Sequence, residues 1–276
     1  MSMERDIAHE ATDRQIAALE RRIVNLYATV KNGLQERVTA YFKQFEKLDA
    51  QKRKQLDAGK ITKQEFAQWR LAQIGRGKMF EALRDKVAED LTDVTNEATE
   101  LVAAEMPGAY AINYNQEAET INADDGSAIP IITAAAIALL WQQNSDTMTR
   151  PKLNRPKAIA WNRTNFSASV TSGILLGKPL LGKNSICEMS VTMTVEKSRH
   201  SARVNARTFL TVAETRGRQA VYNLAEKLGI HREKIWHTAH DNRVRHQHAL
   251  MDGVTVLATE KFSVDGYDMI GPGDTS

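Results

Sequence analysis

Four histidines near the carboxyl end of the chain are the first candidates for chemistry. They share one short segment with two aspartates, as His237, His240, Asp241, His246, His248 and Asp252. Imidazole and carboxylate groups bind zinc and iron, so a metal-dependent hydrolase that uses Asp241, His246 and His248 is one hypothesis. The spacing matches neither the helical His-Glu-x-x-His arrangement nor a paired Cys/His finger, and Arg243 and Arg245 would repel a cation. We therefore assign no metal. The alternative is a structural network of Asp241, Arg245 and His248, in which the carboxylate caps a turn and accepts from the arginine.

A nucleophile and a nucleotide site are harder to identify. Cys187 lies at a predicted helix start, which would lower the pKa of its thiol. No histidine follows it in local register, and a lone cysteine is more often a small buried hydrophobe. Gly173, Gly177 and Gly182 are too widely spaced for a phosphate-binding loop. We therefore expect no catalytic residue, no cofactor and no enzymatic activity.

Arginines on a predicted long helix indicate a different kind of contact. Residues at i, i+4 and i+8 share a helix face, and Arg199, Arg203 and Arg207 have this spacing. Basic side chains on one face can neutralise the phosphates of a polyanion such as double-stranded DNA. Arg216 and Arg218 on the same predicted helix complete the candidate contacts. These arginines could equally pair with acidic side chains such as Glu196 or Glu214.

The charge is unevenly distributed along the chain. The formal net charge of +3 is the sum of a neutral N-terminal part (1–105), an acidic part without lysine or arginine (106–149) and a basic remainder. Residues 150–245 carry 18 basic and 6 acidic side chains. Such asymmetry indicates a polyanion or an acidic protein surface as partner, although a solvated basic surface is the simpler interpretation.

Composition excludes several classes of protein. One cysteine rules out an internal disulfide framework and a Cys-rich zinc module. The charged N-terminus lacks the apolar region of a secretory signal. The longest apolar stretch, 128–141, is shorter than the roughly 18–20 residues that span a bilayer. We therefore expect no membrane partner.

The N-terminal third, 1–108, is predicted to form a long amphipathic helical hairpin. A capping box at Thr12–Gln15 predicts the first helix, whose apolar stripe runs to Leu48 at alternating spacings of three and four residues. A second capping box at Thr62–Glu65 predicts a restart, and Pro107-Gly108 is expected to end the second stripe. Two such helices can pack against each other or serve as an arm that docks onto a larger assembly.

The remainder divides into a connector, 109–150, and a basic domain, 151–276. We expect 109–126 to be irregular and partly extended, Ser127–Gln142 to form a short buried helix, and 145–157 to mark a domain boundary. Helices are predicted over 158–176, closed by Gly177, and from a capping box at Ser185–Glu188 to Leu228, with Gly229 as the C-terminal cap. Short strands are expected at Val254–Leu257 and Phe262–Val264. The predicted fold is mainly α, with the N-terminal hairpin and a helical C-terminal domain that ends in a small α+β region.

The last third carries an ordered set of residues that is similar to a known family. In chain order it comprises Ala206–Thr208, Ala213–Arg218, Gly229-Ile230, Lys234–Trp236, Asp241, Arg245, His248, Asp252-Gly253, Phe262 and Pro272–Asp274. This set resembles the C-terminal domain of tailed-phage minor head proteins, the Mu F-like or head-morphogenesis family. Upstream segments at Ala109–Asn115 and Ser172–Ile174 resemble longer members. Members commonly continue into a Cys-Arg-Cys-like end, which this sequence lacks, so a metal role shared with His248 is not expected.

The resemblance implies a virion component that acts in head assembly. Members associate with the portal oligomer and other capsid proteins and assist procapsid assembly, DNA packaging or delivery. The implied location is the capsid interior near the portal vertex, and the host cytoplasm during assembly. The residues that the resemblance implies as a signature or structural network are Arg207, Thr208, Glu214, Trp236, Asp241, Arg245, His248, Asp252 and Gly253. A helical scaffold without DNA contact stays open beside the metal-dependent hydrolase.

Overall fold

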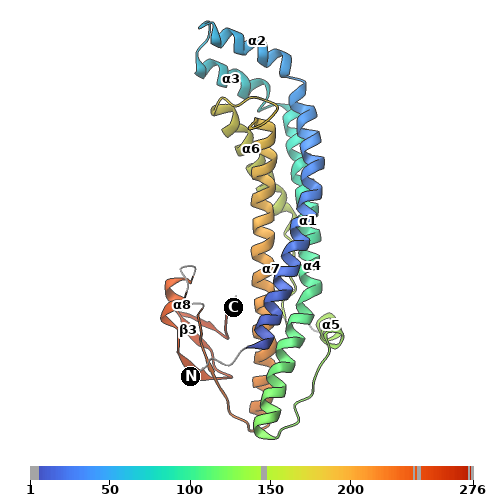
Figure 1. Cartoon of the computed structure of the whole chain (residues 1–276), viewed down its shortest axis with the longest axis vertical. Helices are drawn as coiled ribbons and strands as arrows, with labels where there is room; N and C mark the ends of the chain where they lie inside the picture. Colours follow the sequence, from blue (N-terminus) through green and yellow to red (C-terminus); the bar gives the residue numbers. More distant parts are fainter. Residues whose placement is uncertain (1–5, 144–147, 239, 241–243, 273, 275–276) are drawn as a thin grey trace. The chain divides into compact units, whose positions relative to one another are not determined.

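The computed structural model describes residues 6–143, 148–238, 240, 244–272 and 274, and these are mainly helical, as predicted. Figure 1 shows α1, α4 and α7 as the long helices, with short strands, β3 among them, near the carboxyl end. The helices are α1 (Ile7–Lys43), α2 (Glu46–Asp57), α3 (Lys63–Gln73), α4 (Lys78–Asp125), α5 (Ala134–Gln143), α6 (Arg155–Leu175), α7 (Ile186–Lys227) and α8 (His246–Leu250). The strands are β1 (Glu233–Ile235), β2 (Thr255–Leu257), β3 (Phe262–Val264) and β4 (Tyr267–Met269).

The chain forms two compact units, each built from separate parts of the sequence. Unit 1 comprises residues 1–19, 101–151 and 205–276, and unit 2 comprises 20–100 and 152–204. Each unit therefore contains one stretch of α1, one of α4 and one of α7. The helical hairpin expected from the N-terminal third gains a third long helix in both units.

The core of unit 2 forms where apolar stripes meet. Buried side chains come from α1, α4, α6 and α7 and include Ile23, Leu34, Val38, Leu91, Phe166, Val170, Val191 and Val195. A polar layer interrupts this core, because the Tyr27 hydroxyl lies 2.8 Å from Thr95 Oγ1 and 3.1 Å from Ser198 Oγ. Buried hydroxyls need partners, so this layer favours one register of α1, α4 and α7.

Unit 1 contains the part of the fold that positions the candidate site. Its buried helical residues are mostly small or aliphatic and include Leu19, Met106, Ala109, Ile121, Ala206, Leu210, Ala213, Val221 and Ala225. After α7, the chain forms a small C-terminal subdomain (residues 230–274). Strands β1 and β2 pair antiparallel with Lys234 opposite Val256, and β3 and β4 pair antiparallel with Ser263 opposite Asp268.

Three predictions about helix boundaries in unit 1 are wrong, those for α4, α1 and α5. Helix α4 continues through Pro107 to Asp125, so 109–126 is helical and not irregular. Its apolar face stays buried beyond the proline, at Ala109, Ala118 and Ile121, and this tertiary packing outweighs the hydrogen bond that proline cannot donate. Helix α1 starts at Ile7, before the Thr12 capping box.

The early start of α1 follows from Asp6. Its carboxylate accepts a hydrogen bond from the backbone amide of His9 at 2.9 Å, which is the contact of an N-cap residue. Thr12 is therefore internal to the helix and fully buried, and its hydroxyl donates to the Ala8 carbonyl at 3.1 Å. A capping box cannot form at a residue whose backbone is already helical.

Two other local predictions are confirmed. The Thr62 capping box is present in both directions, and Gly177 and Gly229 follow α6 and α7 with φ of +67° and +80°.

The prediction for α5 is wrong in its start and in its burial. The helix begins at Ala134 rather than Ser127, and Leu139 and Leu140 are exposed, although a buried helix was expected. Among the described residues, no helix combines the length and apolar character that crossing a bilayer requires.

Candidate functional site

The segment Ala213–Arg218 of α7 is the centre of the candidate site in unit 1. Ala213 is fully buried and Gly217 lies against α4, where a Cβ atom on Gly217 would be 2.4 Å from the Tyr110 carbonyl oxygen. Real Cβ atoms do not approach so closely, so the two backbones can meet here only because this residue is glycine. The close contact holds Glu214 and Arg218 next to α1 and α4.

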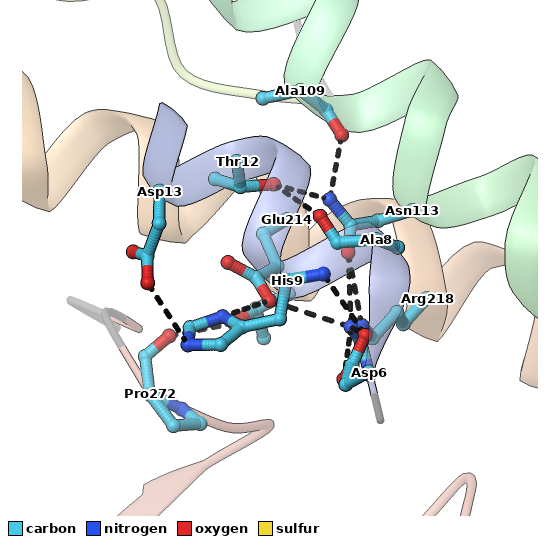
Figure 2. Close-up of polar contacts among 11 residues, drawn as sticks. Asp6, Ala8, His9, Thr12, Asp13, Ala109, Asn113, Glu214, Arg218 and Pro272 are labelled. Carbon is cyan, nitrogen blue, oxygen red and sulfur yellow. Dashed lines mark hydrogen bonds and ion pairs between the residues drawn. The ribbon is translucent and has the colours of Figure 1, made fainter. Parts of the chain in front are cut away.

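Glu214 forms an ion pair with His9 of α1. Glu214 Oε1 lies 2.9 Å from His9 Nδ1, and Asp13 Oδ2 lies 3.7 Å from His9 Nε2 (Figure 2). The hydrogen bond to Glu214 raises the pKa of His9 to about 9, with smaller contributions from the charges of Glu214, Asp13 and Asp6. His9 is therefore an imidazolium ion at neutral pH, which donates a hydrogen bond to Glu214 and lies at ion-pair distance from Asp13.

Arg218 connects the same region to the start of α1 and to α4. Its Nη2 lies 2.7 Å from Asp6 Oδ2 and 3.0 Å from Asn113 Oδ1. The Asn113 amide in turn donates to Thr12 Oγ1 at 2.8 Å and to the Ala109 carbonyl at 2.9 Å (Figure 2). Three helix segments of unit 1 are thus joined by one continuous polar network.

A cavity of about 300 Å³ adjoins this network. It is lined by residues of α1, α7 and the C-terminal subdomain, among them Asp6, His9, Glu214, Arg218, Lys234, Trp236 and Phe262. Lys234 donates from Nζ to Gln219 Oε1 at 2.8 Å and to the Ile270 carbonyl at 2.9 Å. Burial lowers the pKa of Lys234 to about 8. The cavity combines aromatic walls with a partly desolvated ammonium group.

Trp236 forms the core of the C-terminal subdomain with Phe262. The two rings meet edge to face with centroids 5.1 Å apart, and His248 lies 5.5 Å from the Trp236 ring. The Gly253 amide donates to the Trp236 carbonyl at 2.8 Å, and Gly253 has φ of +79°, which glycine adopts without strain. His248 and Gly253, which the family resemblance selects together with Trp236, thus both contact Trp236.

Asp252 orders the loop that follows β1. Its Oδ1 accepts from the backbone amide of Thr238 at 2.9 Å, and its Oδ2 lies 3.6 Å from His240 Nε2. The hydrogen bond from the Thr238 amide lowers the pKa of Asp252. The role of this signature carboxylate in the structure is to hold backbone in place.

Of the remaining signature residues, Arg245, which is exposed, and His248, which is half-buried, line an open hollow of about 420 Å³ with Tyr267. His246, a candidate of the hydrolase hypothesis, is exposed. Arg207 and Thr208 lie on α7, exposed and half-buried respectively.

Asp241 and Arg243 lie outside the described residues, so the network and the ligand set that include Asp241 stay predictions. Within the described ranges, no three His, Cys, Asp or Glu side chains are grouped as a metal site.

Carboxylate partners are described for the candidate arginines Arg199, Arg203, Arg216 and Arg218. Arg199 pairs with Glu196, Arg203 Nη2 lies 2.7 Å from Glu20, Arg216 Nη2 lies 3.4 Å from Asp274, and Arg218 pairs with Asp6 and Glu214. Pairing with acidic side chains, which the sequence left open beside phosphate contact, is therefore the arrangement observed at these four positions.

Cys187 has the environment of a structural cysteine. Its side chain is buried in unit 2, where Gln35 Nε2 donates to Sγ at 3.0 Å. Burial raises the pKa of the thiol, so the nucleophilic thiolate is disfavoured.

Sequence reasoning missed Asp6, His9 and Asn113, although they hold Glu214 and Arg218. The only sequence signal was weak: Asp6 stands three residues before His9, the spacing of an N-cap aspartate. Their distant partners are 101 to 212 residues away along the chain, and no local pattern reports such contacts.

Comparisons with protein-family models, curated proteins and solved structures found nothing that matches this chain.

Proposed function

We propose that this protein is a minor head protein of a tailed phage, which binds the portal oligomer and neighbouring capsid proteins during head assembly. The observation that carries the proposal is the ordered signature of the last third of the chain. Its described members include the Ala213–Arg218 segment, which joins three helix segments, and Trp236, which forms the core of the C-terminal subdomain with Phe262. Residues that recur in order are expected to have such structural roles.

The proposed role is structural, and the long helices supply the means. An α-helix rises about 1.5 Å per residue, so the 37 residues of α1 and the 48 of α4 provide long surfaces for a ring-shaped partner. The proposed location is the capsid interior near the portal vertex, with assembly in the host cytoplasm.

Contact with packaged DNA is the less supported part of the proposal. The excess of basic residues in 150–245 favours a polyanion or an acidic protein surface, but carboxylates already neutralise Arg199, Arg203, Arg216 and Arg218. These internal pairs weaken the case for either partner at these four positions, so the binding experiments below decide between the two. No contact in the described residues favours the metal-dependent hydrolase.

Association with the portal is tested by co-expression with the portal protein of the same phage. The two proteins should co-purify and co-sediment with portal oligomers or procapsids. As a control, the variant Gly33→Ala changes a helix position without a neighbour within 4 Å and should behave as the wild type. A protein that sediments alone in the presence of both assemblies would contradict the proposal.

DNA contact is tested separately with charge-reversed variants. Replacement of Arg199, Arg203 and Arg207 by Glu should weaken binding to double-stranded DNA and reduce the slope of log K against log salt, by about 1 for each phosphate that the protein no longer neutralises. The matched control reverses three exposed basic residues of the neutral N-terminal part, Arg21, Lys54 and Lys60. Equal effects of the two triple variants, or no binding by the wild type, would remove DNA from the proposal.

A further inference from the structure

Among the residues that the structure describes, Lys234 is the only lysine that lines the cavity of about 300 Å³ in unit 1, and its surroundings are unusual for an ammonium group. Its side chain is half-buried, and Nζ lies 5.3 Å from the centroid of the Phe262 ring. Nζ donates to two neutral acceptors, Gln219 Oε1 and the Ile270 carbonyl. Because an ammonium group has three donors, one N–H remains available on the side chain that lines the cavity.

The other cations of the cavity are matched by carboxylates. His9 pairs with Glu214, and Arg218 pairs with Asp6. Lys234, in contrast, has no ion pair among the residues that the structure describes. Asp274 and Glu260 favour its charge at longer range only, and burial dominates. Lys234 therefore lines the cavity without a carboxylate at ion-pair distance among the described residues.

The walls beside Lys234 are apolar, and the cavity itself is open to solvent. Trp236 and Phe262 are buried in the subdomain core and line the cavity. Exposed residues Ile235 and His237 line it as well, so a ligand can reach it from solvent. A concave, largely apolar space with a few polar groups that fix orientation is the usual form of a ligand site.

We propose that this cavity binds a carboxylate attached to an apolar or aromatic group, with Lys234 as the carboxylate's partner and Trp236 and Phe262 as the apolar wall. Two sources share this chemistry, the C-terminal residue of a polypeptide and an internal Asp or Glu next to an apolar residue. A carboxylate would accept from the third N–H of Lys234 and supply the counter-ion that Lys234 lacks. This inference does not rest on the proposed function.

Calorimetric titration with small probes tests the site. N-acetyl-L-phenylalanine represents a C-terminal residue, N-acetyl-L-phenylalaninamide is the neutral control, and the amide of N-acetyl-Phe-Asp represents an internal acid. We expect at least one acid to bind about tenfold more tightly than the neutral amide, the change that a charge-assisted hydrogen bond provides. The acid that binds more tightly identifies the source.

Variants of Lys234 decide whether this residue is responsible. Lys234→Met keeps the apolar stem and should reduce acid binding about tenfold, to the level of the amide, whereas Lys234→Arg keeps the charge and should retain most of it. Lys227→Met, at an exposed lysine at the end of α7, is the matched control. Circular dichroism confirms that each variant is folded. Acid and amide that bind equally, an acid that binds Lys234→Met as tightly as the wild type, or no acid binding at all would overturn the proposal.

Discussion

Gly217 of α7 and Tyr110 of α4 mark a point of backbone contact between two helices of unit 1. A Cβ atom at Gly217 would lie 2.4 Å from the Tyr110 carbonyl oxygen and 3.2 Å from the Tyr114 amide nitrogen. Both obstacles are backbone atoms, which cannot rotate away as a side chain does. The glycine therefore sets the distance between α4 and α7, and with it the position of the neighbouring Glu214 and Arg218.

The first prediction concerns Gly217→Ala. The added methyl group should separate α4 from α7 and lower the free energy of unfolding by about 1–3 kcal/mol or more, the cost of overpacking a core. Helix propensity alone would favour alanine by about 0.5–1 kcal/mol, so a loss identifies the steric term. Chemical denaturation followed by circular dichroism provides the measurement.

Gly33→Ala is the matched control for this prediction. Gly33 also lies inside a helix, but a Cβ atom there would meet nothing within 4 Å. The variant should be unchanged or more stable by about 0.5–1 kcal/mol. Equal effects of the two substitutions would show that the contact with the Tyr110 carbonyl does not restrict position 217 to glycine.

The second prediction is a pH dependence caused by His9. Its pKa rises from 6.5 to about 9 in the folded protein, first because of the hydrogen bond to Glu214. A raised folded-state pKa gives a stabilisation that is complete below about pH 6.5 and is lost as the pH rises through about 9. The side chain is 55% exposed, so solvent screening limits the effect to about 1 kcal/mol or less.

His9→Gln tests this dependence by thermal unfolding between pH 6 and 10. The difference in Tm between the wild type and the variant should be largest at the acidic end and disappear at the alkaline end. His200→Gln, at an exposed histidine of α7, should follow the wild type throughout. A Tm difference that stays constant between pH 6 and 10 would show that the contribution of His9 to stability does not depend on its protonation, which would contradict the prediction.

The third prediction concerns a buried ion pair of unit 2. Arg70 is fully buried, and its Nε and Nη2 lie 2.6 Å and 2.7 Å from the two carboxylate oxygens of Asp49. Arg70→Met leaves that carboxylate buried without its counter-ion and should cost about 3–5 kcal/mol. The double variant with Asp49→Leu removes both charges and should recover much of this loss. Chemical denaturation of the wild type, the two single variants and the double variant gives the coupling energy between Arg70 and Asp49. If the losses of the two single variants simply add up in the double variant, the ion pair does not contribute to stability.

The features that could be predicted from sequence are those whose causes are local. The Thr62 capping box needs only Glu65, and the left-handed residue Gly229 needs only the end of α7, so both were found from neighbouring residues. The mainly helical fold and two of the four described strands, β2 and β3, likewise followed from short-range periodicity.

The features that could not be predicted depend on distant partners. Pro107 should end a helix on local grounds, yet α4 continues because its later turns are buried in unit 1. The pairing of His9 with Glu214 joins residues 205 positions apart. The arginines of α7 were found from their spacing, but Glu20, the partner of Arg203, is 183 positions away. Sequence spacing identifies a charged side chain and does not identify what neutralises it.

The last prediction concerns Trp236, which the family resemblance selects and which the structure places in the core of the C-terminal subdomain. The ring is 3% exposed and packs against Phe262. Trp236→Ala removes this contact and should cost about 3–5 kcal/mol locally. Because the subdomain's buried cluster is small, the loss should appear as faster amide hydrogen exchange in residues 230–274, with exchange in unit 2 unchanged.

Tyr267→Ala, at a side chain that is 67% exposed in the same subdomain, is the control and should change stability by less than about 0.5 kcal/mol. Exchange that stays at the wild-type rate in Trp236→Ala would show that the subdomain does not depend on this side chain, and the signature tryptophan would then need a role in binding instead.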